Sequence, residues 1–218
     1  MDAHSTAVAD RFRRLYSPAV ADALDDLGLR HQAMSHALRP LDPTTVIAGP
    51  AFTIVGQPDA SLDTKTRKGP VVIDHFRPGV IAVYDTGGEN VTGVWGELWS
   101  AGAASRGCVG AIVDGGIRDT GFIRRAGFPV FHRFTTPYDA IGRFNVVDFE
   151  CTATVGGVRV SPGDYIFGDE DGVLVIPAEV TLQVLEKAES VGENENRIRA
   201  EIKPGISLAQ LYRDYGKF

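Results

Sequence analysis

The sequence predicts a mixed α/β fold, and two patterns in the 218-residue chain indicate it. In the middle of the chain, short runs of β-branched residues alternate with stretches of helical spacing, which is typical of β-α-β units with parallel strands. Further on, alternating apolar and polar residues are separated by glycine-containing turns, which predicts antiparallel pairing. A chain of this length with 44% hydrophobic residues can bury a full core.

The first elements are a helix and a strand. Residues 17–28, SPAVADALDDLG, predict a short helix that Ser17 caps, that begins with proline and that Gly28 ends. Residues 46–55, VIAGPAFTIV, predict an edge or bulged strand, because a glycine and a proline interrupt the β-branched run.

The alternating middle region predicts strand, helix, strand, helix and strand in residues 80–84, 93–106, 109–113, 120–126 and 129–132. Residues 146–155 and 158–160 then predict strands joined by a glycine pair. Residues 162–177 predict a hairpin whose DEDG turn carries solvated charges. From Pro177 onward a long helix is expected, interrupted or bent near Gly192, followed by a second short helix around residues 208–216. We therefore expect an α/β core in residues 1–177 and a helical segment in residues 178–218.

Composition argues against a nucleic-acid-binding surface and against a membrane protein. The formal net charge is -6, and no basic stripe is present to neutralise phosphates. The first 15 residues lack the apolar core of a signal peptide, and no run approaches the roughly 18 apolar residues of a membrane span. Cys108 and Cys151 form neither a metal-binding pair nor a disulfide framework, so a cytoplasmic protein with two reduced thiols is expected.

Polar residues follow two neighbouring strands of the predicted parallel sheet. Residues 85–97, DTGGENVTGVWGE, follow one strand, and residues 114–119, DGGIRD, follow the next. Because ligands bind outside the carboxyl ends of strands in open α/β sheets, the two loops should meet at one site. The glycine-rich first loop and the helix after it offer backbone N–H groups to an anion such as a carboxylate, and Glu97 adds a carboxylate to the first helical turn.

The second loop brings an arginine and an aspartate together. The guanidinium of Arg118 suits a carboxylate or an enolate oxygen, and Asp119 offers a hard oxygen ligand to Mg²⁺ or Mn²⁺. The alternative is that the two residues cap the following helix or pair with nearby charges. A lysine Schiff base is disfavoured because the five lysines fall in polar loops, a surface helix or the tail. For His75 and His132 a structural role is favoured over metal binding, because neither has a second ligand at zinc-like spacing.

The spacing of four residues in these loops resembles the signature of the RraA-like family, which includes 4-hydroxy-4-methyl-2-oxoglutarate and 4-carboxy-4-hydroxy-2-oxoadipate aldolases, the class II pyruvate aldolases. Three residues separate Gly93 from Glu97, and twenty more precede Arg118 and Asp119. The resemblance extends to GPAFTIV, GCVGAIVDGGIRD, FPVF and PGDYIFGDEDGVLVIP, at residues 49–55, 107–119, 128–131 and 162–177.

The resemblance implies an α-β-β-α sandwich that assembles as a homotrimer or homohexamer. It also implies a site with a role for each residue of the motif: Gly96, Glu97, Leu98 and Trp99 form a pyruvate pocket, Arg118 binds the 2-oxo acid substrate, and Asp119 is the direct ligand of a divalent cation, Mg²⁺ or Mn²⁺. The implied reaction is retro-aldol cleavage of a 4-hydroxy-2-oxo acid to pyruvate and a second oxo acid, with oxaloacetate decarboxylation as a side activity. A metal-bound water polarised by acidic neighbours such as Glu97 is the expected base.

Several alternatives stay open at the level of sequence. RraA proteins proper share the fold but inhibit ribonuclease E, and they are associated with loss of the acidic residue that this chain retains as Glu97. A third reading is a metal-dependent lyase or hydratase acting on a different hydroxy acid. Trp95 and Trp99 either reshape the pocket or pack in the core. The family's aldolases also receive a glutamate from the C-terminal helix of a neighbouring subunit, for which Glu193 and Glu195 are candidates, a solvated helix face being the favoured alternative.

Overall fold

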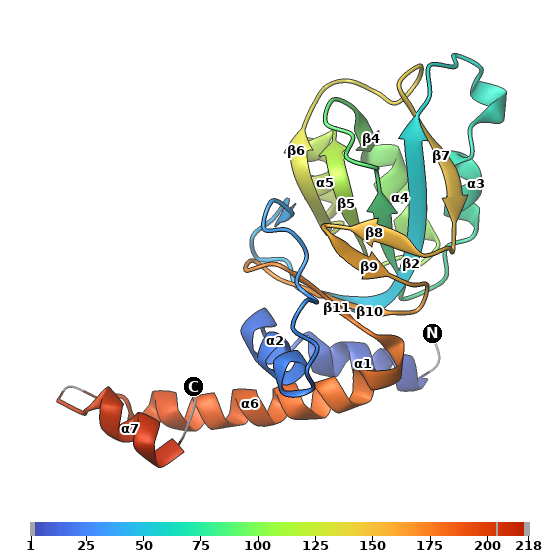
Figure 1. Ribbon diagram of the computed structural model, residues 1–218. Helices are drawn as coiled ribbons and strands as arrows, with labels where there is room; N and C mark the ends of the chain where they lie inside the picture. Colours follow the sequence, from blue (N-terminus) through green and yellow to red (C-terminus); the bar gives the residue numbers. More distant parts are fainter. Residues whose placement is uncertain (1–2, 204, 216–218) are drawn as a thin grey trace.

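A curled mixed sheet forms the centre of the molecule in the computed structural model, which describes residues 3–203 and 205–215 (Figure 1). Seven of its nine strands follow the order β1-β6-β5-β3-β2-β10-β11, with β4 paired to β5 and β7 paired to β2. The sheet strands are β1 (Arg39–Pro40), β2 (Ile47–Pro58), β3 (Ile81–Asp85), β4 (Gly93–Trp95), β5 (Gly110–Ile117), β6 (Val130–Thr135), β7 (Phe144–Phe149), β10 (Tyr165–Gly168) and β11 (Val173–Ile176). A separate hairpin consists of β8 (Ala153–Val155) and β9 (Val158–Val160).

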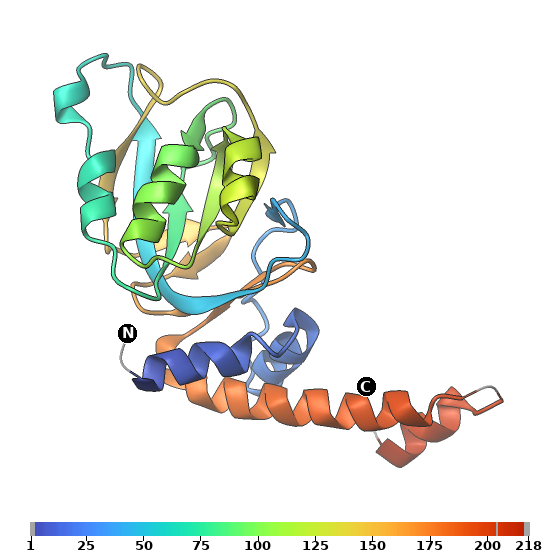
Figure 2. The ribbon, with the colours of Figure 1, turned by 180° about the vertical axis from the view of Figure 1, so that it is seen from behind.

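The expected β-α-β-α-β run is confirmed. Strand β5 pairs in parallel with β3 on one side and with β6 on the other. Three helices cover one face of this sheet, as Figure 2 shows, namely α3 (Gly69–Asp74), α4 (Glu97–Ser105) and α5 (Thr120–Ala126). The β8-β9 hairpin covers the opposite face (Figure 1), so the sheet has a separate apolar core on each side. A mixed α/β fold is therefore established.

Strand β2 is central, which corrects the expectation of an edge strand. It pairs in parallel with β3, and along its other side it pairs first with β10 and then with β7. The bulged character is confirmed by a register shift between Val55 and Gly56 in the pairing with β7. A Cβ at Gly56 would lie 2.3 Å from the Phe144 ring, so only glycine lets the two strands approach here.

Two further boundaries differ from the sequence prediction. Strand β5 continues to Ile117, because Gly93 and Trp95 of β4 pair with its last residues. A Cβ at Gly116 would lie 2.6 Å from the Thr92 carbonyl oxygen, so this glycine belongs to a tightly packed strand. The long strand expected in residues 146–155 is divided at Glu150, whose φ of 52° breaks the extended backbone.

The terminal helices form a third layer against the β10-β11 hairpin (Figure 1). Helix α1 (Ala3–Phe12), which the sequence analysis did not predict, and α2 (Ser17–Asp26) pack against α6 (Thr181–Glu201). Two short 3₁₀ helices, η1 (Thr64–Thr66) and η2 (Ala178–Val180), and the terminal helix α7 (Leu208–Tyr215) complete the fold. None of the helices in the described residues has the length and apolar character needed to cross a membrane.

Contacts in this third layer correct three local expectations. Helix α6 runs uninterrupted through Gly192, which is buried next to the Tyr16 ring. Tyr16, not Ser17, is the N-cap of α2, and Asp169 accepts hydrogen bonds from the Ser17 backbone N and Oγ at 2.7 and 2.8 Å. The DEDG turn therefore does not consist only of solvated charges, because Asp169 is buried beneath the start of α2.

Candidate functional site

A cavity of about 340 Å³ lies beyond the carboxyl ends of β4, β5 and β6. Its walls come from the start of α3, the start of α4, the end of β5 and the loop that follows β6. Sequence reasoning singled out Gly96, Leu98, Trp99, Arg118 and Asp119, and all five line this cavity. The two polar loops therefore meet, as the strand order requires.

Asp119 occupies an unusual backbone conformation at the centre of the site. Its φ of 58° and ψ of 28° place it in the left-handed region, and among the described residues only Glu150 is another non-glycine residue with positive φ. Although Asp119 stands at the N-cap position of α5, its side chain makes no capping hydrogen bond. The carboxylate instead turns back toward α4, so the reading of Asp119 as an ordinary helix cap does not hold.

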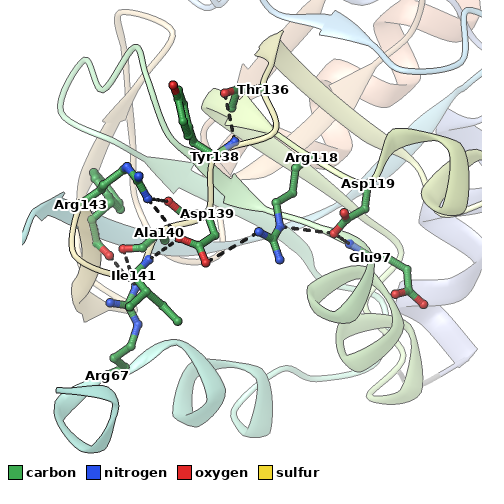
Figure 3. A network of polar contacts seen from close by, with 11 residues as sticks. Arg67, Glu97, Arg118, Asp119, Thr136, Tyr138, Asp139, Ala140, Ile141 and Arg143 are labelled. Carbon is green, nitrogen blue, oxygen red and sulfur yellow. Dashed lines mark hydrogen bonds and ion pairs between the residues drawn. The ribbon is translucent and has the colours of Figure 1, made fainter. Parts of the chain in front are cut away.

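The Asp119 carboxylate faces an arginine and a helix terminus. Its Oδ2 lies 3.4 Å from Nε of Arg118 and accepts a 3.3 Å hydrogen bond from the backbone N of Glu97 (Figure 3). Gly96 permits this approach, because a Cβ there would lie 2.7 Å from the same oxygen. The Arg118 backbone N donates to the Trp95 carbonyl at 2.9 Å, which ties the pair to β4.

The first turn of α4 opens toward this cluster. Gly96 is its N-cap and has no side chain to satisfy the helix N–H groups. In the described part of the chain, no side-chain acceptor contacts the backbone N of Leu98 or Trp99, and both residues line the cavity. This end of α4 can therefore receive an anion.

Glu97 lies at the site only through its backbone. Its N–H meets Asp119, whereas Figure 3 shows its carboxylate directed away from both Asp119 and Arg118. The two tryptophans have different positions. Trp95 packs in the core, where it is fully buried and donates from Nε1 to Ser100 Oγ at 2.8 Å. Trp99 is half-buried and forms part of the cavity wall.

A half-buried ion pair supports the middle of β5. Asp114 accepts hydrogen bonds from Arg133 Nε and from the Gly156 backbone N, the latter at 2.7 Å, and its own carbonyl oxygen accepts from Thr86 Oγ1 at 2.6 Å. These contacts link β5 to β6, to the segment after β3 and to the β8-β9 turn. They fix the position of β5, the strand that Arg118 follows.

The loop after β6 supplies a wall that sequence reasoning missed. Asp139, which lines the cavity, lies 4.0 Å from Nη1 of Arg118 and 3.2 Å from Nη1 of Arg143 (Figure 3). Its carboxylate also accepts from the Ile141 backbone N at 3.2 Å. The sequence could have indicated Asp139 only through its position. Residues 136–143 follow the third parallel strand and should reach the same edge of the sheet as the other two loops.

Other candidate residues lie away from the cavity. His75 lies on the surface, and its Nδ1 is 2.8 Å from the carbonyl oxygen of Val71. His132 has a buried Nδ1 without a hydrogen-bond partner, and burial is the main cause that lowers its pKa. On α6, Glu195 accepts from Tyr16 Oη at 2.7 Å, and Glu193 is exposed.

The residues at the cavity fit a hydrated divalent cation. The Asp119 carboxylate is 38% exposed at the cavity, so a face remains open beside its contact with Arg118. Within the described residues, no group of three His, Cys, Asp or Glu side chains is assembled to hold a metal. Zinc normally takes three or four protein ligands, whereas Mg²⁺ keeps several waters and needs one or two carboxylates. A hydrated cation at this cavity would have Asp119 as its carboxylate ligand.

The molecule is a mixed α/β protein in which an arginine and an aspartate follow a central parallel strand and face the N-terminus of the helix α4. A family model described as RraA-like, Aldolase/RraA, matches residues 17–175, and the chain belongs to this family. A protein of Halalkalibacterium halodurans named "Putative 4-hydroxy-4-methyl-2-oxoglutarate aldolase" is 33% identical over 207 residues, which are 93% of this chain and 91% of the relative.

Two other similar proteins differ from this relative, one in its length and the other in the inhibitor family to which it is assigned. Protein DlpA of Legionella pneumophila is 33% identical over 201 residues, which are 91% of this chain, but the chain spans only 32% of the length of DlpA. The crystal structure of Streptomyces coelicolor RraAS2, described as an unusual member of the RNase ES inhibitor RraA protein family, matches with a TM-score of 0.79 at 26% identity. That match covers 88% of this chain and 96% of the other.

Proposed function

We propose that this chain is a divalent-metal-dependent lyase that cleaves a 4-hydroxy-2-oxo acid to pyruvate and a second oxo acid. The observation that carries the proposal is the placement of Asp119, in a left-handed conformation, between Arg118 and the first turn of α4, where it accepts a hydrogen bond from the Glu97 backbone N. A cation-binding carboxylate, an oxyanion-binding arginine and a carboxylate-binding helix end thus share one cavity. The name of the Halalkalibacterium relative supports the same reaction class.

Each residue at the cavity has a distinct task in this proposal. The backbone N–H groups of Leu98 and Trp99 bind the carboxylate of the 2-oxo acid, and Arg118 donates to its 2-oxo oxygen. Asp119 holds Mg²⁺ or Mn²⁺. Gly96 keeps this face free of a side chain, because any Cβ would collide with Asp119.

Bond cleavage releases pyruvate in two stages. The C3–C4 bond breaks, its electron pair moves toward C3 and the 2-oxo oxygen, and the 4-hydroxyl gives its proton to a base as the second carbonyl forms. Protonation at C3 then completes pyruvate. The metal, when bound, supplies Lewis-acid stabilisation of the charge that develops on the 2-oxo acid. Arg118 stabilises the same charge. The carboxylate of Glu97 points away from Asp119 and Arg118, so Glu97 contributes its backbone N–H at Asp119 and is not given the role of polarising the base.

Oxaloacetate should reach the same enolate by losing CO₂, so decarboxylation is the proposed side activity. The test is a coupled assay for pyruvate from oxaloacetate and from 4-hydroxy-4-methyl-2-oxoglutarate, with Mg²⁺, Mn²⁺ or EDTA. Pyruvate that depends on the metal and is lost in Arg118→Ala supports the mechanism. The absence of turnover with every metal overturns it.

A second candidate is a regulator that binds a ribonuclease or another protein without catalysis, which the likeness to RraAS2 favours. The retained Glu97 favours the enzyme. Asp119→Ala separates the two, because a catalyst loses turnover whereas a binding protein keeps its partner. A lyase or hydratase of a different hydroxy acid would respond to Asp119→Ala as the proposed enzyme does, and a panel of hydroxy acids distinguishes it.

Assembly is part of the proposal. A homotrimer or homohexamer would bring helix α6 of one chain toward the cavity of another, where Glu193 or Glu195 would act. Because Glu195 is already bound to Tyr16, the exposed Glu193 is the better placed of the two. Mixing inactive Asp119→Asn and Glu193→Gln subunits should restore activity if one chain completes the site of its neighbour.

A further inference from the structure

The cavity contains a second arginine that the proposed mechanism does not use. Arg67 lies in the segment between η1 and α3 and lines the same cavity as Arg118 and Asp119. It also lines an adjoining cavity of about 260 Å³, which shares Trp99 and Ala140 with the first. Figure 3 shows that Arg67 and Arg118 approach the loop containing Asp139 from two different sides.

The Arg67 guanidinium is held in place but is not fully satisfied. Nη2 donates to the carbonyl oxygens of Ala140 and Phe144, at 3.2 and 2.6 Å. Nη1 is buried and has no hydrogen-bond partner. A buried cationic donor without an acceptor is unfavourable, because it has lost its water and gained nothing in exchange. The fixed plane and the unpaired donor together favour an anion as the missing partner.

The carboxylates of Asp59 and Asp139 form their hydrogen bonds with other groups. Asp59 has a lowered pKa, caused first by the backbone N–H of Ser61 and then by Asn145, with a smaller contribution from Arg67. Asp139 is engaged by Arg143 and by the Ile141 backbone N. In the described part of the chain, the hydrogen bonds of the Arg67 guanidinium thus go to carbonyl oxygens and not to a carboxylate.

We propose that Arg67 binds the distal carboxylate of a dicarboxylic substrate and thereby selects dianionic over monoanionic 2-oxo acids. The inference rests on the proposed function for the position of the first carboxylate, at the start of α4. With one carboxylate there and the reacting carbons beside Arg118 and Asp119, the far end of the substrate extends toward the Arg67 side of the cavity. Because Nη1 is buried, the Arg67 side chain turns toward the cavity when the distal carboxylate binds, and this carboxylate becomes the acceptor that Nη1 lacks.

The test compares two pairs of compounds that differ only in the distal group. For turnover, 4-hydroxy-4-methyl-2-oxoglutarate is compared with the analogue in which a methyl group replaces its distal carboxylate. For binding without reaction, 2-oxoglutarate is compared with 2-oxopentanoate by calorimetry in the presence of Mg²⁺. Each pair is measured on wild type, Arg67→Met and Arg67→Lys, after the melting temperature has shown that each variant is folded.

Arg67→Met should reduce the preference for the dicarboxylate by about 20-fold or more, since a hydrogen bond between charged groups is lost. Arg67→Lys should retain part of the preference, because one cation remains without the planar fork. The matched control is Lys68→Met, which removes a neighbouring cation that donates to the Val147 carbonyl at 2.6 Å and does not line either cavity. It should leave both preferences within about two-fold of wild type.

An equal loss for both members of each pair in Arg67→Met would overturn the inference, because Arg67 would then only support the loop. The calorimetric pair keeps this result separate from a failure of the proposed reaction. If wild type turns over neither substrate but binds 2-oxoglutarate in preference to 2-oxopentanoate, and only Arg67 variants lose that preference, the anion site stands while the lyase proposal falls.

Discussion

The carboxylate of Asp119 lies so close to the backbone of Gly96 that a Cβ at Gly96 would be 2.7 Å from Oδ2. The same Cβ would be 3.3 Å from Cγ of Arg118. Gly96 has φ of -146° and ψ of -168°, a conformation open to any residue, so its identity is dictated by the close approach and not by backbone freedom.

Gly96→Ala should therefore displace Asp119 and Arg118 without unfolding the protein. We expect pyruvate release to fall by about 100-fold or more, because small displacements of positioned catalytic groups are costly. The coupled pyruvate assay and a melting curve check the two parts. Gly172→Ala is the control, since nothing lies within 4 Å of a Cβ at Gly172. Full activity in Gly96→Ala would show that the close contact is not needed for the reaction.

Replacing Asp119 should weaken metal binding and leave the free energy of unfolding nearly unchanged. Asp119→Asn keeps the shape but removes the anionic oxygen, so Mn²⁺ binding followed by electron paramagnetic resonance should weaken by about ten-fold or more. In Asp119→Gly the left-handed backbone is retained without its side-chain strain, and the free energy of unfolding should stay within about 0.5 kcal/mol of wild type while turnover is lost.

Asp171→Asn serves as the control for metal binding, because Asp171 is exposed in the turn after β10. It should bind Mn²⁺ as wild type does. Undiminished Mn²⁺ affinity in Asp119→Asn would mean that other groups hold the metal.

The Asp114-Arg133 pair should contribute to stability. Asp114→Ala leaves Arg133 Nε and the Gly156 N–H without their acceptor, and we expect the free energy of unfolding in urea to fall by about 2 kcal/mol. This value allows for Arg133, whose side chain is 35% exposed and partly hydrated. Asp74→Asn breaks the exposed pair with Arg106 and should cost less than about 0.5 kcal/mol. Equal losses in the two variants would contradict a special role for Asp114.

The contact between α1 and α6 should make stability sensitive to acid. Arg11 donates to both carboxylate oxygens of Glu189, at 2.8 and 2.6 Å, and this hydrogen bonding is the first cause that lowers the pKa of Glu189 below 4.5. A carboxyl group whose pKa is lower in the folded state stabilises that state above the unfolded pKa. Its contribution is lost as the pH falls through the folded pKa.

Melting temperatures from pH 6 down to pH 3 should therefore fall less steeply in Glu189→Gln than in wild type. Glu186→Gln is the control, because Glu186 lies on the same helix and acts on Arg11 through its charge alone, without a hydrogen bond or ion pair to it in the described structure. Identical slopes in wild type and Glu189→Gln would show that α1 and α6 do not hold this contact in solution.

Much of the architecture was predictable because it depends on local patterns. The parallel run of β3, β5 and β6 follows from alternating apolar segments, and the meeting of the loops that contain Gly96 and Arg118 follows from the shared edge where parallel strands end. The central place of β2 was not predictable in this way. A Gly-Pro pair is typical of an edge strand, but here Pro50 lies where the pairing with β10 ends, and the pairing with β3 begins at the next residue, Ala51.

The sequence by itself determined the composition of the site: an arginine and an aspartate after a buried strand, with a glycine and a helix start beside them. Tertiary structure decided which way each group points. The carboxylate of Glu97 turns away, the left-handed Asp119 turns back to α4, and Arg67 reaches the cavity from a polar loop. These features depend on contacts between distant segments, and such contacts leave no periodic pattern in the sequence.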